Sequence, residues 1–267
     1  MAVGLDQLAQ DLADESKALR TLLVGLDADG WDLPTPAAGW AVRDQISHLA
    51  YFDDQALLSA TEPETFQAEL EKLLANGGLS TEAVAEAHRD LPGSALLAWF
   101  DTSRARLISV FAGLDGSKRV PWYGPPMSVT SSLTARLMET WAHGQDVADA
   151  LGARLEPTSR LRHVAHIGVR TFGFSYALRG RTAPGDAVRV ELTAPDSDEV
   201  WTWGDADAAN RVTGPALDFC LVVTQRRHRD DTALVSTGPV AEEWLSIAQA
   251  YAGEPGPGRP PQGRPAG

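Results

Sequence analysis

The chain has 267 residues, of which 43% are hydrophobic and 22% are charged, a composition typical of a globular protein with a buried core. Its formal net charge of -13 argues against binding to nucleic acid or to anionic membranes. The single cysteine, Cys220, excludes an internal disulfide, and the start of the chain lacks the positive and apolar segments of a signal peptide. We therefore expect a cytoplasmic protein without a membrane span, since no stretch approaches the ~18 apolar residues that cross a bilayer.

In the first half of the chain, apolar residues recur every three to four positions, which is typical of amphipathic helices. The pattern predicts long helices over residues 5–28, 41–60, 94–114 and 128–152, and shorter ones over 64–75 and 81–89. Two segments rich in proline or glycine, 34–40 and 120–128, predict loops. The fold class expected for residues 1–155 is an all-α antiparallel four-helix bundle.

The second half of the chain has a mixed pattern. It predicts a helix over 159–180, alternating strands within 186–195, 199–204 and 209–214, and two helices over 215–227 and 239–253. We expect residues 156–252 to form a smaller α/β domain. Residues 253–267 consist mainly of proline, glycine and polar residues, which predicts a disordered tail.

The fourth long helix carries a candidate pair of metal ligands. Glu139 and His143 are four positions apart, so both side chains can converge on one point, and Asp146 follows on the same face. Helix bundles build open metal sites from such pairs. The alternative is a solvated polar face made of Arg136, Glu139, His143, Asp146 and Asp149.

His48 lies on the second long helix, and taken alone it is typical of a hydrogen-bonded histidine at the edge of a core. Two longer motifs favour a different interpretation. GWAVRDQISHLAYFD, residues 39–53, resembles the second-helix motif of the DinB-like family. ETWAHGQDVADALG, residues 139–152, resembles the fourth-helix motif of its mycothiol-dependent maleylpyruvate isomerase branch. The resemblance covers about residues 5–152 and implies that His48, Glu139 and His143 bind a divalent metal ion.

Two imidazoles and one carboxylate would leave a coordination position for water, a thiolate or a substrate oxygen. A structural zinc site is more often closed by four protein ligands, commonly cysteines, and Cys220 alone cannot supply them. We expect Zn²⁺, with Ni²⁺, Co²⁺ or Fe²⁺ as alternatives. Asp44 and Asp146 are the predicted acceptors for the second N–H groups of the ligating histidines.

The second half of the chain gives weaker functional signals. Its string VTGPALDFCLVVTQRR is similar to strings in an actinobacterial subgroup of metal-binding proteins, and the domain weakly resembles sterol-carrier-type domains. An arginine of the second domain assists the active site in the isomerase, so the resemblance implies Arg226 and Arg227 as candidate catalytic residues. His166 is a further candidate, which either faces the cleft between the halves or packs in their interface. His163 and His166 are an alternative metal pair, but they lack a carboxylate at matching spacing.

The resemblance implies an enzyme that uses a low-molecular-weight thiol of the mycothiol type to attack a small electrophilic or carbonyl-containing metabolite, as a transferase or an isomerase. Three alternatives remain: a thiol-independent lyase, hydratase or isomerase, a metal-containing protein that binds a small ligand, and a scaffold without chemistry. We expect a small-molecule partner and a monomer or homodimer. Trp122, Tyr123 and Met127 either line a substrate pocket or close one end of the bundle.

Overall fold

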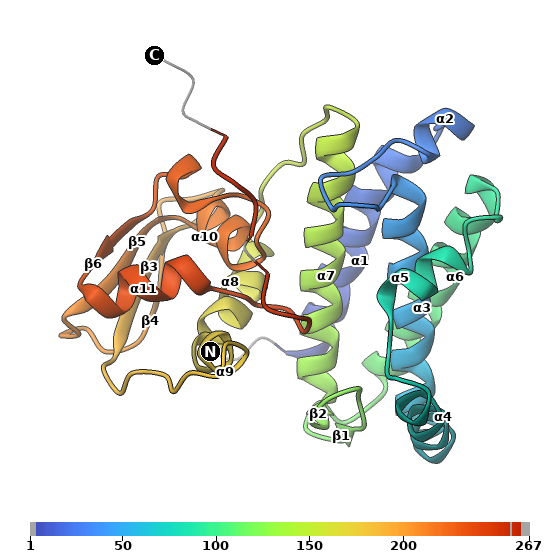
Figure 1. Cartoon of the computed structure of the whole chain (residues 1–267), viewed down its shortest axis with the longest axis horizontal. Coiled ribbons are helices and arrows are strands. Elements are labelled where there is room, and N and C mark those ends of the chain that lie inside the picture. Colours follow the sequence, from blue (N-terminus) through green and yellow to red (C-terminus); the bar gives the residue numbers. More distant parts are fainter. Residues whose placement is uncertain (1–3, 257, 263–267) are drawn as a thin grey trace. The chain divides into compact units, whose positions relative to one another are not determined.

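The computed structural model describes residues 4–256 and 258–262, and the chain divides into two compact units, Met1–Leu155 and Glu156–Gly267. The first unit is helical and the second combines helices with a four-stranded sheet, which confirms the predicted fold class (Figure 1). Within the described residues, no helix combines the length and the apolar composition that crossing a membrane requires.

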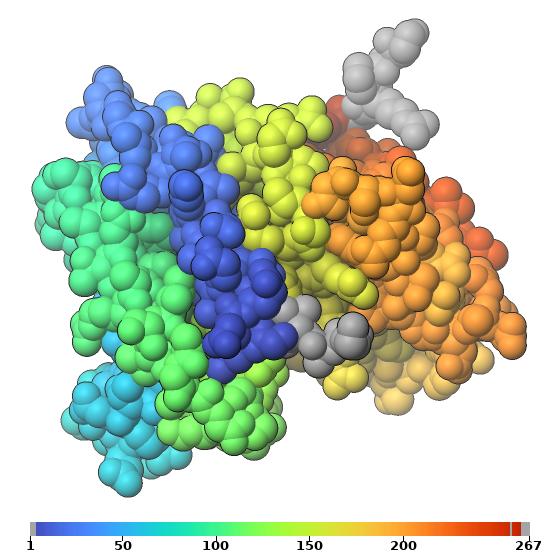
Figure 2. Space-filling model, turned by 180° about the vertical axis from the view of Figure 1, so that it is seen from behind, coloured from blue at the N-terminus to red at the C-terminus, as the bar shows by residue number. Residues whose placement is uncertain are grey.

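Four long helices make the bundle: α1 (Leu5–Leu23), α3 (Val42–Thr61), α6 (Gly93–Ala112) and α7 (Val129–Ala150). Both α1 and α3 pack against α6 and against α7, and the outer faces of α1 and α6 lie side by side in Figure 2. The connections contain α2 (Ala28–Trp31), α4 (Pro63–Ala75), α5 (Thr81–Glu86) and a hairpin of β1 (Arg119–Val120) with β2 (Met127–Ser128).

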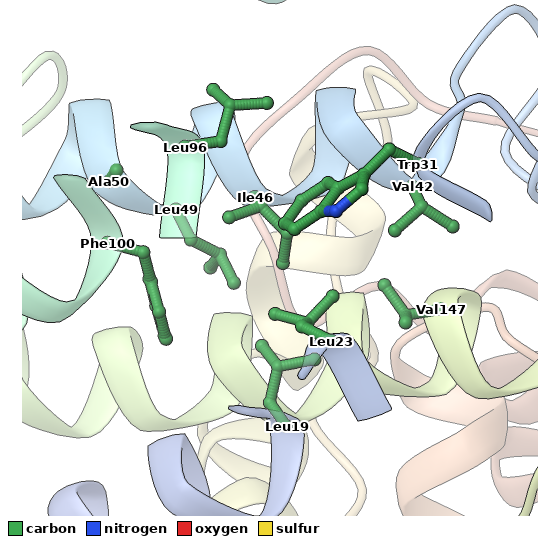
Figure 3. Packing of buried hydrophobic residues seen from close by; sticks show 10 residues of the cluster. All are labelled: Leu19, Leu23, Trp31, Val42, Ile46, Leu49, Ala50, Leu96, Phe100 and Val147. Carbon is green, nitrogen blue, oxygen red and sulfur yellow. The ribbon is translucent and has the colours of Figure 1, made fainter. Parts of the chain in front are cut away.

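The apolar faces of these helices meet in a buried cluster that also fixes α3 against α7 (Figure 3). On α3, Ile46 and Leu49 belong to the cluster, and His48 lies between them in the sequence. On α7, Val147 belongs to it, one turn beyond His143. The cluster therefore sets the register of the two helices that carry the candidate metal ligands. Its ten residues are Leu19, Leu23, Trp31, Val42, Ile46, Leu49, Ala50, Leu96, Phe100 and Val147.

The first helix is shorter than the predicted 5–28. It ends at Leu23 because Gly25 has a φ of 88°, a left-handed conformation that stops helices and that glycine adopts without strain. Asp27 then begins α2, with its carboxylate accepting a hydrogen bond from the Gly30 N–H. The prediction of an uninterrupted loop over 120–128 is also incomplete, since the ends of this segment contribute to the β1–β2 hairpin.

The second unit contains a sheet with strand order β4-β3-β5-β6. Its central strands β3 and β5 run parallel, and each pairs antiparallel with the neighbouring edge strand. The strands are β3 (Val188–Thr193), β4 (Val200–Trp203), β5 (Asn210–Pro215) and β6 (Val235–Thr237). Helix α10 packs on β3, β5 and α8, and α11 packs on β5, β6 and α9. The helices are α8 (Leu161–Arg170), α9 (Phe172–Ala177), α10 (Ala216–Val223) and α11 (Pro239–Ile247), with a 3₁₀ turn at Arg229–Asp231.

Three boundaries in this unit differ from prediction. The single helix expected over 159–180 is broken at Thr171, which separates α8 from α9 and whose hydroxyl donates to the carbonyls of Ile167 and Gly168. The helices expected over 215–227 and 239–253 end at Val223 and Ile247. Strand β6 was not predicted, because three residues are too few to show alternation.

The described part of the proline-rich tail, residues 253–256 and 258–262, makes hydrogen bonds to other residues of the second unit. The Arg179 guanidinium donates to the Gly256 carbonyl, and the Gln262 N–H donates to the Asp231 carboxylate. The disorder expected for 253–267 stays a prediction, and residues 257 and 263–267 lie outside the described residues.

We predict that Gly93→Ala destabilises the protein. Gly93 begins α6 directly beside the buried Trp31 indole, and a Cβ at this position would overlap the ring. Overpacking of this kind costs about 1 to 3 kcal/mol. Urea unfolding measures the loss, and Gly124→Ala is the matched control, because a Cβ there meets no neighbouring atom. Equal stability of the two variants would contradict the packing described.

Candidate metal centre

The structure brings His48, Glu139 and His143 together inside the bundle. Each offers one ligand atom, and the three atoms lie within 4.8 Å of one another. Glu139 Oε2 is 3.1 Å from His143 Nε2 and 3.6 Å from His48 Nε2. The two imidazole rings are 4.5 Å apart between centroids. Because α3 supplies one residue and α7 the other two, the site depends on how these helices pack.

A chain of hydrogen bonds fixes the orientation of the His143 ring. The Thr35 hydroxyl donates to the Trp40 carbonyl, and the Gln45 amide nitrogen donates to the Thr35 hydroxyl. This leaves the Gln45 Oε1 atom directed at His143 Nδ1. An amide oxygen only accepts hydrogen bonds, so Nδ1 carries the proton and a neutral His143 ring presents a lone pair at Nε2.

The facing atoms call for a positive charge between them. A lone pair on His143 Nε2 and the Glu139 carboxylate repel each other at 3.1 Å unless Nε2 is protonated or both atoms share a cation. A single proton can lie between only one such pair of atoms. Here a third atom with a lone pair, His48 Nε2, also faces the Glu139 carboxylate oxygen. Two nitrogens and one oxygen in this arrangement fit a divalent ion of the zinc type.

Burial sets the protonation of the site. Desolvation, together with the neighbouring His143, lowers the pKa of His48 from 6.5 to about 4, so its ring is neutral at neutral pH. Burial alone would raise the pKa of Glu139, but the contacts of its carboxylate with the His143 and His48 rings, together with the Arg136 charge, hold it well below its usual range. The site therefore presents a neutral His48 imidazole and an ionised carboxylate near neutral pH, with little competition from protons.

Aromatic side chains surround the histidines. Trp40 stacks on His143 with ring centroids 6.0 Å apart, and Phe52 packs 4.6 Å from the His48 ring. Phe52 in turn contacts Trp122 and Tyr123, two of the residues predicted either to line a pocket or to close the bundle. These contacts place apolar surface against the candidate ligands, which lowers the local dielectric and strengthens charge interactions there.

Beside this aromatic cluster lies an open cavity of about 340 Å³, with Tyr51, Phe66, Leu73 and Tyr123 among its lining residues. The Tyr123 side chain thus both packs on Phe52 and lines a cavity. Its hydroxyl donates to Gln55, and burial raises its pKa above the usual range. Tyr123 lines this cavity, whereas Trp122 packs against Phe66 and Phe52. The role of the cavity as a substrate pocket stays a prediction.

The alternative of a solvated polar face on α7 is wrong. Arg136, His143 and Asp146 are buried, because α7 packs against both α1 and α3. Arg136 lies 3.8 Å from Asp53, a fully buried carboxylate that forms a two-pronged ion pair with Arg104. A polar sequence pattern here marks a buried charge cluster rather than a surface.

Asp44 and Asp146 were the predicted hydrogen-bond acceptors for the ligating histidines. The acceptor for His143 Nδ1 is the Gln45 amide rather than Asp44. The Asp44 carboxylate instead caps α3 through the Ala41 N–H and pairs with Arg89. Asp146 is buried on α7, and its role beside the metal stays a prediction.

The predicted catalytic residues of the second half are placed within their own unit. The His166 ring accepts a hydrogen bond from the Trp203 indole, and burial lowers its pKa. The Arg226 guanidinium donates to the Thr224 carbonyl, and that of Arg227 donates to the Arg226 carbonyl. The roles of His166, Arg226 and Arg227 in catalysis stay predictions.

Gln45, Thr35 and Trp40 were not predicted to be parts of the site. Gln45 lies three positions before His48, which places both on one helix face, and this spacing was the available signal. The hydrogen bond to Thr35 crosses from a loop to a helix, and periodicity carries no information about such contacts.

We predict that Gln45→Leu lowers the affinity for a divalent ion by about 10- to 100-fold, because His143 loses the acceptor that fixes its tautomer. Competition with a fluorescent zinc chelator measures the change. Gln55→Leu on the same helix is the matched control, since Gln55 bonds Tyr123 and no candidate ligand. Unchanged affinity in Gln45→Leu would show that the hydrogen bond does not support the site.

We also predict that the metal-free protein loses stability in acid. The folded pKa of His48, about 4, lies below its ordinary value of 6.5, so the unfolded chain binds this proton first as the pH falls. The free energy of unfolding should therefore decrease by up to about 3 kcal/mol between pH 6.5 and pH 4. Urea titrations in the presence of a chelator measure this slope, and His48→Gln should reduce it. An equal slope in both proteins would argue against a neutral buried His48.

Comparison with known protein families gives two matches. The model described as mycothiol maleylpyruvate isomerase N-terminal domain matches residues 12–148, and one described as wyosine base formation matches residues 184–237. Two uncharacterized proteins of Mycobacterium tuberculosis, from strains CDC 1551 / Oshkosh and ATCC 25618 / H37Rv, are each 45% identical over 250 residues. These alignments cover 93% of this chain and 96% of each relative.

Solved structures show the same fold at low sequence identity. The crystal structure of a mycothiol-dependent maleylpyruvate isomerase aligns with a TM-score of 0.56 at 17% identity, and that of its histidine-to-alanine mutant with 0.58 at 16%. Both alignments cover 88% of this chain and 93% of the solved chain. The chain belongs to the family defined by the mycothiol maleylpyruvate isomerase N-terminal domain.

Proposed function

We propose that this protein is a divalent-metal-dependent enzyme that transfers or uses a small thiol, of the mycothiol type, on an electrophilic or carbonyl-containing metabolite. The observation that carries the proposal is the convergence of His48, Glu139 and His143 within 4.8 Å. The solved structures with this fold bear the name of a mycothiol-dependent isomerase, which supports a thiol as co-substrate.

The residues of the chain have distinct tasks in this proposal. His48 offers a neutral nitrogen donor, His143 offers a second nitrogen, and Glu139 offers an ionised oxygen. Gln45 holds His143 in the required tautomer, while Trp40 and Phe52 keep water from one side of the donors. A bound divalent ion, with Zn²⁺ preferred over Ni²⁺, Co²⁺ or Fe²⁺, supplies Lewis acidity that lowers the pKa of a thiol or water at its open position.

The reaction balances without a further reagent. In a transfer, the thiol sulfur adds to the electrophilic carbon of a C=C or C=O double bond, the π bond breaks, and the thiol proton ends on the other atom of that bond. In an isomerisation, the same sulfur–carbon bond forms and then breaks, and the thiol is returned unchanged. A small-molecule substrate is therefore the expected partner in both cases.

We predict stoichiometric metal in protein purified from zinc-replete medium, and its loss in His48→Ala and His143→Ala. Metal analysis by mass spectrometry measures the content, with circular dichroism to confirm that each variant folds. His88→Ala is the matched control, because His88 lies in the same unit and its ring bonds the Val84 carbonyl. Metal-free wild-type protein under these conditions would end the proposal.

The thiol is tested on cobalt-substituted protein, whose absorption spectrum reports a change of ligand. Reduced mycothiol should alter the spectrum, and its disulfide form should not, because only a thiol yields a thiolate. If metal binds and no thiol changes the spectrum, the protein is a thiol-independent lyase, hydratase or isomerase and the thiol-dependent reaction is wrong.

A further inference from the structure

A small cavity in the second unit has four basic side chains in its wall. Its volume is about 90 Å³, and no carboxylate is found among the described residues that line it. This concentration of basic groups is opposite in sign to the protein as a whole, whose net charge is -13. All lining residues belong to the second unit, so the cavity contains none of the candidate metal ligands. The basic residues are Arg227, His228, Arg229 and Arg259.

Uncharged acceptors hold the Arg229 guanidinium in place. Its Nη1 atom donates to the Glu242 carbonyl at 3.1 Å, and its Nη2 atom donates to the Ser236 hydroxyl at 3.4 Å. The Asp230 carboxylate lies 3.8 Å from Nε, but the Asp230 side chain is 68% exposed, so water screens this contact. Arg229 is therefore oriented without being neutralised, and each Nη atom has a second N–H for a ligand.

The His228 ring adds a further donor to the cavity wall. Its Nδ1 atom accepts a hydrogen bond from the Asp230 N–H at 3.2 Å. A ring nitrogen that accepts a hydrogen bond carries no proton, so the proton of a neutral His228 ring is on Nε2. The imidazole thus offers an N–H group at Nε2, as the arginines do at their guanidinium nitrogens.

The neighbouring carboxylates are engaged elsewhere. Asp231 accepts a hydrogen bond from the Gln262 N–H, and Glu243 pairs with Arg181 and accepts from the Tyr176 hydroxyl. Glu242 contributes its backbone carbonyl to Arg229, while its exposed side chain is not part of the cavity wall. The described acidic groups around the cavity therefore leave room for an anion from outside the chain.

The backbone that leads into the basic segment has a strained conformation. Gln225 has a φ of 59°, and it is the one residue other than glycine with a positive φ in the described part of the chain. Its side chain accepts a hydrogen bond from the Tyr251 hydroxyl at 2.6 Å and donates to the Ala248 carbonyl at 3.1 Å. These bonds fix the turn after α10 from which Arg227 and Arg229 follow. Strain that is held by its surroundings in this way is frequent at binding sites.

We propose that this cavity binds the phosphoryl group of a small phosphorylated metabolite. Pockets that enclose a whole ligand measure about 300 to 1,000 Å³, so a cavity of about 90 Å³ accommodates one small group. Guanidinium groups bind phosphate oxygens through paired N–H donors, and three arginines suit a phosphoryl dianion better than a singly charged carboxylate. The inference depends neither on the metal centre nor on the proposed function.

The test is calorimetry on the full chain with three probes: inorganic phosphate, glycerol 3-phosphate and acetate. Wild-type protein should bind a phosphoryl probe saturably and more tightly than acetate, and the tighter of the two phosphoryl probes shows whether the ligand is the free ion or an ester. Arg229→Gln and Arg259→Gln should each weaken this binding by about tenfold or more, because each removes charge-assisted hydrogen bonds. Arg259 lies in the tail after the last helix, so its variant keeps the test valid if Arg229→Gln does not fold. Arg162→Gln is the matched control, since it removes the same charge from the same unit and Arg162 pairs with Glu199.

Each result decides the inference. A loss of affinity in either folded variant, with the Arg162→Gln control unchanged, places the phosphoryl group in this cavity. If neither phosphoryl probe binds saturably up to millimolar concentration, or if acetate binds as tightly, the ligand class is wrong. If phosphate binds and neither folded variant weakens it, or if the control weakens it equally, the anion binds elsewhere and the inference is wrong.

Discussion

The contact between α3 and α7 is the constraint on which the rest of the account depends. It places His48 against Glu139 and His143, and a layer of buried side chains that includes Ile46 and Val147 holds the two helices in that register. The three donor atoms are electron-rich and face one another, an arrangement that a proton or a shared cation between them stabilises. The site is therefore a property of the helix packing as much as of its three residues.

The polar residues around the ligands form two supporting systems. On one side, Thr35 and Gln45 fix the tautomer of His143 through hydrogen bonds. On another, the guanidinium groups of Arg104 and Arg136 lie beside the buried Asp53 carboxylate. The Arg104–Asp53 system is buried and the Thr35–Gln45 system is partly buried, and neither contributes to an apolar core. Such costly arrangements are typical of binding and catalytic sites, where local stability is given up for function.

Much of the bundle was predictable because its helices show a regular apolar period. The pairing of Glu139 with His143 followed from their spacing, but His48 is 91 positions away from Glu139 and entered only through resemblance to a family. The end of α1 was missed because the apolar period runs past Gly25, whose conformation the period does not report. Arg136 was assigned to a solvated face as one alternative, since a buried charge and a surface charge look alike in a sequence.

The most direct test of the metal centre is anomalous diffraction from crystals grown with zinc, recorded on both sides of the zinc absorption edge. The account predicts a single strong peak in the bundle within bonding distance of His48 Nε2, Glu139 Oε2 and His143 Nε2, with density for a non-protein ligand at the remaining position. Well-ordered zinc-grown crystals in which these three side chains point away from one another, with no peak between them, would contradict it.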